Sequence, residues 1–411
     1  MSSSKKPEFT PQPRQLAGVF YYRFLNKFPY GACRPAVRDL RVKIFHACLT
    51  LILLAFTSTG RTVSQVPDYP ARTIKIGLLV QDNSCTSAIQ GAELAIRKAN
   101  EKGGLNGRHF QLVPRSMEGP WGTGSKQAVN LIFEEKVWAL LGSHNGRNAH
   151  LVEQAATKSQ VVFVSAWSGD PTLSQAFVPW FFNCVPNDNQ QSESLTEEIY
   201  NIQKFNKIAV VSGNDYDSKM TLNSFLKSVK KSGKPDPVQF SYDNYSKNLN
   251  VLADKIKDTD AECIVLFCQP PASIRLIKEM KQKKMNLPLF GSIMLLNEDE
   301  LSPEELQTFD NILSIPSGDW SVPEFTNFTH EYQKAFNKMP GMVASYSFDG
   351  MSILIEAIRN AGSDDRELIQ KSLGKIHCKG VTGPIQFDDK GNRSGNFKMI
   401  RTLNGVPASP E

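Results

Sequence analysis

From residue 73 onward, short apolar runs alternate with longer stretches in which apolar residues recur at helical spacing. Several of the short runs are apolar without interruption, which is typical of strands buried on both faces of a parallel sheet. Strands that alternate with helices of about 10–15 residues predict βαβ units, and therefore an α/β fold with parallel sheets. The predicted strands are Ile74–Val80, Phe110–Pro114, Trp138–Leu141, Val161–Ser165, Lys207–Ser212, Val238–Tyr242, Cys263–Cys268 and Leu287–Gly291.

The alternation is interrupted once. Near residues 181–188 an extended segment is followed by Pro186 and a run of Asn, Asp and Gln, after which a second set of four strands begins. Two helical stretches come late, at Pro323–Lys338 and Val343–Ala361, and Gly383–Gly391 predicts two extended pieces around a turn. We interpret this pattern as two doubly wound, Rossmann-like lobes.

The lobe boundaries follow from that interruption and from the late elements. We place residues 73–186 and 316–377 in lobe 1, and residues 187–315 and 378–404 in lobe 2. Ligands of open parallel sheets bind beyond the carboxyl ends of the strands. A cleft between the two lobes is therefore the expected binding site for a small molecule.

A different pattern precedes residue 73. The apolar run 44–56 has 13 residues, which at about 1.5 Å each reach roughly 20 Å, short of the ~30 Å hydrocarbon core of a membrane. A basic leader over residues 1–60 that contains this short apolar core is typical of a secretory signal peptide. We therefore predict export to the periplasm or another extracytoplasmic compartment. The long basic part also allows the segment to be retained as an N-terminal anchor.

The net charge of +6 sits in this leader. Residues 1–60 hold nine Lys and Arg against two Asp and Glu, a net of +7, and the remaining 351 residues hold 38 against 39, a net of −1. A nearly neutral body argues against a nucleic-acid partner, which needs a basic surface. We expect this body to be monomeric.

The motifs of common catalytic and cofactor sites are missing from the sequence. No Gly-x-Gly-x-x-Gly follows the first strand, and no Gly-x-Ser-x-Gly occurs. His144 and His150 are six residues apart, so they do not share one helix face and do not have metal-ligand spacing. We therefore expect no cofactor, no metal and no enzymatic activity. An exported enzyme on a Rossmann-like scaffold is the least favoured interpretation.

Several segments together resemble type I periplasmic solute-binding proteins, in the leucine/isoleucine/valine-binding branch that serves ABC transporters. The resemblance covers residues 73–404 and implies two lobes joined by three hinge crossings that close on a ligand. The segments that carry it are Ile74–Leu79, Gln90–Arg108, Leu140–Ser143, Lys207–Val211, Ser345–Gly350 and Val381–Asp388.

The resemblance implies ligand contacts in five loops. The loop after the third strand, with Ser143, Asn145 and Gly146, would bind a ligand carboxylate. The loop after the fourth strand would supply amide and hydroxyl donors; in this sequence it holds Trp167, Ser168 and Gly169, the last of which falls where amino-acid binders have threonine. In lobe 2 the implied contacts are Tyr216, Gln269, at a position near a ligand-facing aromatic residue, and Ile293.

Ile293 marks a departure from the family pattern. The family's acid for the ligand ammonium falls near this position, where the sequence has no acid. Because an ammonium in a closed cleft needs a carboxylate partner, an ordinary α-amino acid ligand is in doubt. Asp82 and Asp215 lie in loops from which either could substitute, and solvated loop acids are the simpler interpretation of both.

Three tryptophans, Trp121, Trp167 and Trp320, fall in segments expected to border the cleft. Each is interpreted either as core or as a ligand wall. As a wall they would favour an aromatic, quaternary-ammonium or large apolar ligand.

The leading hypothesis is an exported protein that captures a small solute, such as an amino acid or amide, and delivers it to the membrane permease of an ABC importer. The alternative is a sensor module that presents its ligand to a receptor or signalling partner. The sequence does not separate these two, because the difference lies in the partner.

Overall fold

The computed structural model describes residues 73–175, 178–242 and 249–408, so the predicted leader lies outside the described residues. Within the described part, none of the helices combines the length and apolar character needed to span a bilayer.

Lobe 1 is built on a sheet of five parallel strands in the order β2-β1-β3-β4-β5. Ile76 and Leu78 of β1 lie on one face of this sheet and pack with α2 and α11. Leu79 lies on the opposite face and packs with α3 and α4. The bounds are β1 Ile74–Val80, α2 Thr86–Glu101, β2 Phe110–Ser116, α3 Thr123–Phe133, β3 Ala139–Ser143, α4 Gly146–Ser159, β4 Phe163–Ser165, η1 Pro171–Ser174, β5 Phe181–Asn183, α10 Pro323–Phe336, α11 Met342–Ala361 and α12 Arg366–Gly374.

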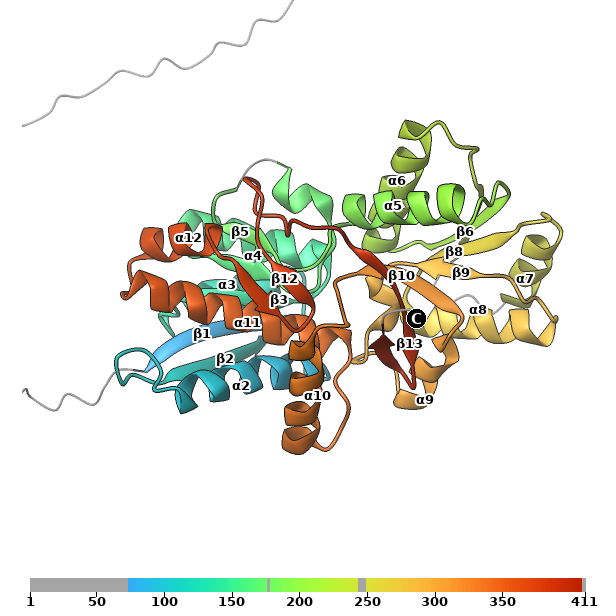
Figure 1. The fold of residues 1–411 in the computed structure, drawn as a ribbon. Coiled ribbons are helices and arrows are strands. Elements are labelled where there is room, and N and C mark those ends of the chain that lie inside the picture. The colour runs from blue at the N-terminus through green and yellow to red at the C-terminus, as the bar shows by residue number, and fades with distance from the viewer. Residues whose placement is uncertain (1–72, 176–177, 243–248, 409–411) are drawn as a thin grey trace, which may run out of the picture. The chain divides into compact units, whose positions relative to one another are not determined.

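Lobe 2 has a sheet in the order β14-β13-β10-β9-β8-β6-β7, in which β13 and β14 run antiparallel to their neighbours. The bounds are α5 Asp188–Thr196, η2 Glu197–Ile202, β6 Ile208–Gly213, α6 Tyr216–Lys231, β7 Val238–Tyr242, α7 Leu249–Lys257, β8 Cys263–Phe267, α8 Pro270–Gln282, β9 Leu289–Gly291, η3 Ile293–Leu296, α9 Pro303–Leu306, η4 Gln307–Phe309, β10 Leu313–Ser317, β13 Lys398–Leu403 and β14 Val406–Ala408. The predicted α/β class with two doubly wound lobes is confirmed (Figure 1).

The chain crosses between the lobes three times. The first crossing joins β5 to α5 and the second joins β10 to α10. The third lies between β12 (Gly383–Ile385) and β13. Three crossings agree with the expected connectivity.

The position of the third crossing differs from the boundary expected at residue 378. β12 forms an antiparallel hairpin with β11 (Cys378–Gly380), and the hairpin lies beside α11 of lobe 1 (Figure 1). Asp349 of α11 holds it there, because its carboxylate accepts hydrogen bonds from Val381 N at 2.8 Å and Thr382 N at 2.9 Å. The strand partner of β12 is therefore β11, which precedes it in the sequence.

Four buried polar residues tie the first and third crossings together: Asn183, Asn187, Asn392 and Arg393, which we call the hinge cluster. Arg393 is 2% exposed, and its guanidinium donates to the carbonyls of Cys184, Thr382 and Pro384 at 2.9–3.2 Å. Asn392 Oδ1 accepts from Asn187 Nδ2 at 3.0 Å. The hinge is thus a hydrogen-bonded unit rather than a set of loose linkers.

Candidate functional site

A cavity of about 260 Å³ lies between the two lobes, at the carboxyl ends of their parallel strands. Both lobes contribute to it, as expected for paired open sheets. Lobe 1 lines it with Gln81, Asp82, Ser84, Cys85, Ser143, His144, Asn145, Trp167, Ser168, Gly169, Asp170 and Val343; lobe 2 lines it with Asp188, Gln191, Asp217, Thr221, Gln269, Ser292, Ile293, Met294, Asn297, Asp299 and Glu300.

Most of the residues expected at the site meet at this cavity. Seven line it directly: Ser143, Asn145, Trp167, Ser168, Gly169, Gln269 and Ile293. Two more, Gly146 and Tyr216, do not line it but lie beside it, where they bond across the lobes.

Two of the three tryptophans do not reach the cavity. Trp121 is 88% exposed and belongs to a separate surface groove. Trp320 is 4% exposed, donates through Nε1 to Ser317 Oγ at 3.0 Å and packs edge-on against Tyr346. Of the two interpretations offered for Trp320, the core position is the one that the structure supports. Trp167 is half-buried against the cavity.

The loop after β3 is shaped by the start of α4. Asn145 caps this helix, because its side chain accepts from Asn148 N at 2.9 Å. His144 beside it is 2% exposed and stacks on Phe163. Burial lowers the pKa of His144 to about 4, so this imidazole carries no charge at neutral pH.

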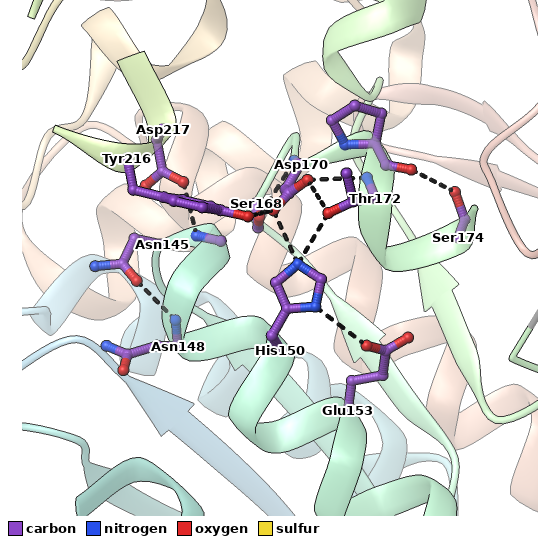
Figure 2. A network of polar contacts seen from close by, with 12 residues as sticks. Asn145, Asn148, His150, Glu153, Ser168, Asp170, Thr172, Ser174, Tyr216 and Asp217 are labelled. Carbon is purple, nitrogen blue, oxygen red and sulfur yellow. Dashed lines mark hydrogen bonds and ion pairs between the residues drawn. The ribbon is translucent and has the colours of Figure 1, made fainter. Parts of the chain in front are cut away.

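The loop after β4 ends at Asp170, the centre of a polar network (Figure 2). Its carboxylate is bonded to His150 Nε2 at 3.0 Å, Thr172 Oγ1 at 2.7 Å and Tyr216 Oη at 2.8 Å. Burial alone would raise the pKa of Asp170, but these hydrogen bonds outweigh it and lower the pKa. The hydrogen bonds from His150 to Asp170 and Glu153 raise the pKa of His150 to about 9, so His150 is protonated at neutral pH.

Hydrogen bonds join the lobes on two sides of the cavity. On one side, Tyr216 Oη donates to Asp170, and Gly146 N donates to Asp217 Oδ1 at 3.0 Å (Figure 2). On the other, Asp299 accepts from Ser87 N at 2.7 Å, at the start of α2. Glu298 accepts from Ala344 N at 2.8 Å, at the start of α11. Carboxylates at helix N-termini are favoured by the helix dipole, so both contacts hold the lobes together.

The two acids considered as substitutes at position 293 have different surroundings. Asp82 lines the cavity and accepts from Ser84 N at 2.7 Å. Asp215 is not part of the lining; it caps α6 through Ser218 N at 3.0 Å and accepts from Gln269 Nε2 at 3.0 Å.

Sequence reasoning missed two carboxylates that line the cavity from lobe 2, Asp188 and Asp217. Asp188 is the first residue of α5, directly after the capping residue Asn187. In the sequence it stands within a run of polar residues, which indicates a break between domains rather than a binding residue. Asp217 lies in the first turn of α6, where an acid is also expected simply because it favours a helix start. Neither signal separates a site residue from an ordinary helix terminus.

Metal binding has no support in the part of the chain that the structure describes, where no group of three or more His, Cys, Asp and Glu side chains is arranged to hold an ion.

Comparisons with known proteins show which family this chain is similar to. The model of the family described as periplasmic binding protein matches residues 73–401. An amino acid binding protein from Pseudomonas aeruginosa is 20% identical over 315 residues, covering 74% of this chain and 81% of that protein.

Two solved structures share the fold at low identity. One is the branched-chain amino acid transporter substrate binding protein LivJ from Streptococcus pneumoniae in complex with isoleucine, with a TM-score of 0.70, 19% identity, and coverage of 82% of this chain and 100% of that one. The other is a solute binding protein of an ABC transporter from R. palustris in complex with benzoate, with a TM-score of 0.70, 17% identity, and coverage of 82% and 95%. The same fold therefore holds chemically different ligands.

Proposed function

The chain belongs to the periplasmic binding protein family, and from this membership we propose that it is an exported solute-binding protein that delivers a small organic molecule to the permease of an ABC importer. The observation that carries the proposal is the cavity itself, which both lobes line with polar groups and which lies at the strand ends. Proteins similar in fold include an ABC transporter substrate-binding protein with isoleucine and one with benzoate.

The proposed mechanism is capture followed by closure. The ligand first contacts lobe 1, through the loops that hold Ser143 and Trp167. Lobe 2 then closes, and Tyr216 and Asp217 bond to lobe 1 beside the cavity. Closure is favoured by ligand because the lobe 2 contacts exist only in the closed arrangement.

A thermal-shift screen of the full chain tests this function. The library comprises amino acids, amides, short peptides, amines and aromatic acids. A ligand present at about 100 times its dissociation constant should add about 2.7 kcal/mol to the free energy of unfolding. A complete absence of stabilisation across the library contradicts the proposal.

A further inference from the structure

The charge of the cavity lining indicates the class of ligand, and this inference rests on the proposed binding function. Six carboxylates line the cavity, and its described lining contains no lysine or arginine. The one histidine in the lining, His144, is neutral because burial lowers its pKa to about 4. The described lining is therefore rich in carboxyl groups and has no positively charged side chain.

Four of the six carboxylates have other roles or lie at the edge. Asp170 is paired with protonated His150, and Asp299 holds the start of α2. Asp82 bonds within its own turn, to Ser84, and Glu300 is exposed. Asp188 and Asp217 remain.

Asp188 is the more enclosed of these two. It is 5% exposed, and its carboxylate has a hydrogen bond from Thr221 Oγ1 at 2.9 Å and a long one from Gln191 Nε2 at 3.4 Å. No cation contacts it within the described residues. Burial raises the pKa of Asp188 well above its usual range, as expected for a carboxylate that lacks a positive partner.

Gly169 makes room for this carboxylate. A Cβ on Gly169 would lie 2.5 Å from Asp188 Oδ1, which is too close for any side chain. The absence of a side chain at position 169 therefore lets the acid of lobe 2 approach the backbone of lobe 1. The close approach positions a carboxyl group at the cavity wall, where burial of its charged form without a positive partner costs free energy.

Asp217 lines the same cavity from α6. Its Oδ1 accepts from Gly146 N at 3.0 Å, and burial raises its pKa to about 6. The guanidinium of Arg147 lies over the Tyr216 ring, 5.6 Å from its centre, outside the lining. Its attraction for Asp217 is smaller than the effect of burial.

Two further features of the wall indicate a polar, cationic occupant. Ser292 lines the cavity and is 2% exposed, and its Oγ has no hydrogen-bond partner among the described residues. Buried hydroxyls are nearly always bonded, so this one is available to a ligand. The half-buried indole of Trp167 lines the same space, and a tryptophan face attracts alkylammonium groups.

We propose that the cavity binds an organic cation, an amine whose positive charge is balanced by Asp188 and Asp217, and that it rejects ligands with a net negative charge. The uncompensated carboxylates and the unbonded Ser292 hydroxyl together define this class.

A matched set of ligands tests the proposal on the full chain by calorimetric titration. 1,5-Diaminopentane and L-lysine have a net positive charge. L-norleucine is a zwitterion of net charge zero that lacks the side-chain ammonium of lysine, and L-2-aminoadipate has a net negative charge. At least one of the two cations should bind about 30-fold or more tightly than norleucine, since close charge pairs of this kind are worth about 2 kcal/mol or more. Aminoadipate should bind most weakly.

Substitution assigns the effect to the named carboxylate. Asp188→Asn should weaken cation binding about 30-fold and change norleucine binding less than about threefold. Asp258→Asn, at an exposed position of lobe 2, should change neither. Asp217→Asn should act in the same direction as Asp188→Asn, and it serves as the test if Asp188→Asn does not unfold cooperatively.

The outcomes distinguish this inference from the proposed function. Preference of the wild-type chain for norleucine or aminoadipate overturns the cation inference and leaves solute binding intact. Unchanged cation binding in both Asn variants also overturns it. If no member of the set and no member of the wider screen binds, the cation inference and the proposed function fail together.

Discussion

Two buried aspartates of this protein, Asp349 and Asp188, have opposite surroundings. Asp349 is 1% exposed beside the hinge and accepts three hydrogen bonds, from Val381 N, Thr382 N and Thr382 Oγ1. It also faces the charge of Arg393, which lowers its pKa against the larger effect of burial. Asp188 is 5% exposed and has one good hydrogen bond, and among the described residues no cation contacts it. The fold itself supplies hydrogen bonds and a positive charge to Asp349. It supplies Asp188 with neither a full set of hydrogen bonds nor, among the described residues, a positive charge.

The contrast is sharpest at neighbouring positions in the sequence. Asn187 uses its side chain fully, since Oδ1 accepts from Gln190 N and Nδ2 donates to Asn392. Asp188, the next residue, turns an incompletely bonded carboxylate toward the cavity. Buried polar groups cost free energy unless they are bonded. Of these two neighbours, the fully bonded side chain belongs to the hinge cluster and the incompletely bonded one lines the cavity.

The largest loss of stability is expected from removing Arg393, the positively charged residue of the hinge cluster. Arg393→Met deletes the hydrogen bonds to three carbonyls and leaves Asp349 buried without its counter-charge. Loss of these bonds, together with the positive charge that faces a buried carboxylate, should lower the free energy of unfolding by about 3–5 kcal/mol, which urea denaturation measures. Arg401→Met removes one exposed arginine with a single long contact to Ser314, and should change stability by less than about 0.5 kcal/mol. Equal losses in the two variants would show that Arg393 has no special role.

A pair of identical substitutions tests the two aspartates directly. Asp349→Asn replaces an acceptor of two backbone N–H groups by an amide that presents NH₂ to one of them, and should lower the free energy of unfolding by about 1.5–3 kcal/mol. Asp188→Asn removes a charge that the unliganded fold does not balance, so it should leave stability unchanged or raise it. Thermal unfolding of both variants without ligand measures the difference. A larger loss for Asp188→Asn than for Asp349→Asn contradicts the comparison.

The sequence predicts the fold better than it predicts the site, and individual elements show why. β1 and β7 begin and end as predicted, because short runs rich in β-branched and aromatic or aliphatic residues between helical stretches are local signals. β10 (Leu313–Ser317) was missed since it contains Pro316, and β13 since Arg401 and Thr402 interrupt its apolar residues. The late hairpin depends on Asp349, which is about 30 residues away in sequence.

The site was predicted in outline because its glycines, serines and Trp167 lie in loops directly after strands. Asp188 was not, since its role depends on the glycine at position 169, on a lobe that a different stretch of chain builds. Trp320 was expected near the cleft from its Gly- and Asp-rich neighbours, but its indole is enclosed by Ser317 and Tyr346. Local composition does not report which side chains a fold brings face to face.

A smaller effect, on ligand affinity, is expected from a substitution where the two lobes meet. Tyr216→Phe removes the hydrogen bond to Asp170, which is worth about 1 kcal/mol, and in the proposed mechanism this bond forms as the lobes close. Ligand affinity should therefore fall about fivefold, as measured by titration with the best ligand of the screen. Tyr200→Phe removes a comparable bond to Pro235 within lobe 2; it should lower stability by about the same amount and leave ligand affinity unchanged. Equal affinities in the two variants would contradict a closing role for Tyr216.

The smallest effect, on stability as a function of pH, is expected from His150. Its protonated imidazole is balanced by Asp170 and Glu153 at the edge of the cavity. Its pKa of about 9 lies above the ordinary value of about 6.5. Its contribution to stability is therefore complete below pH 6.5 and is lost as the pH rises through 9. The wild-type melting temperature should fall over that interval more steeply than that of His150→Gln. The difference should be small, since the side chain is 36% exposed and solvent screens such pairs. Parallel curves from pH 6.5 to 9.5 would mean that the protonated imidazole adds nothing to the bonds that Asp170 already makes with Thr172 and Tyr216.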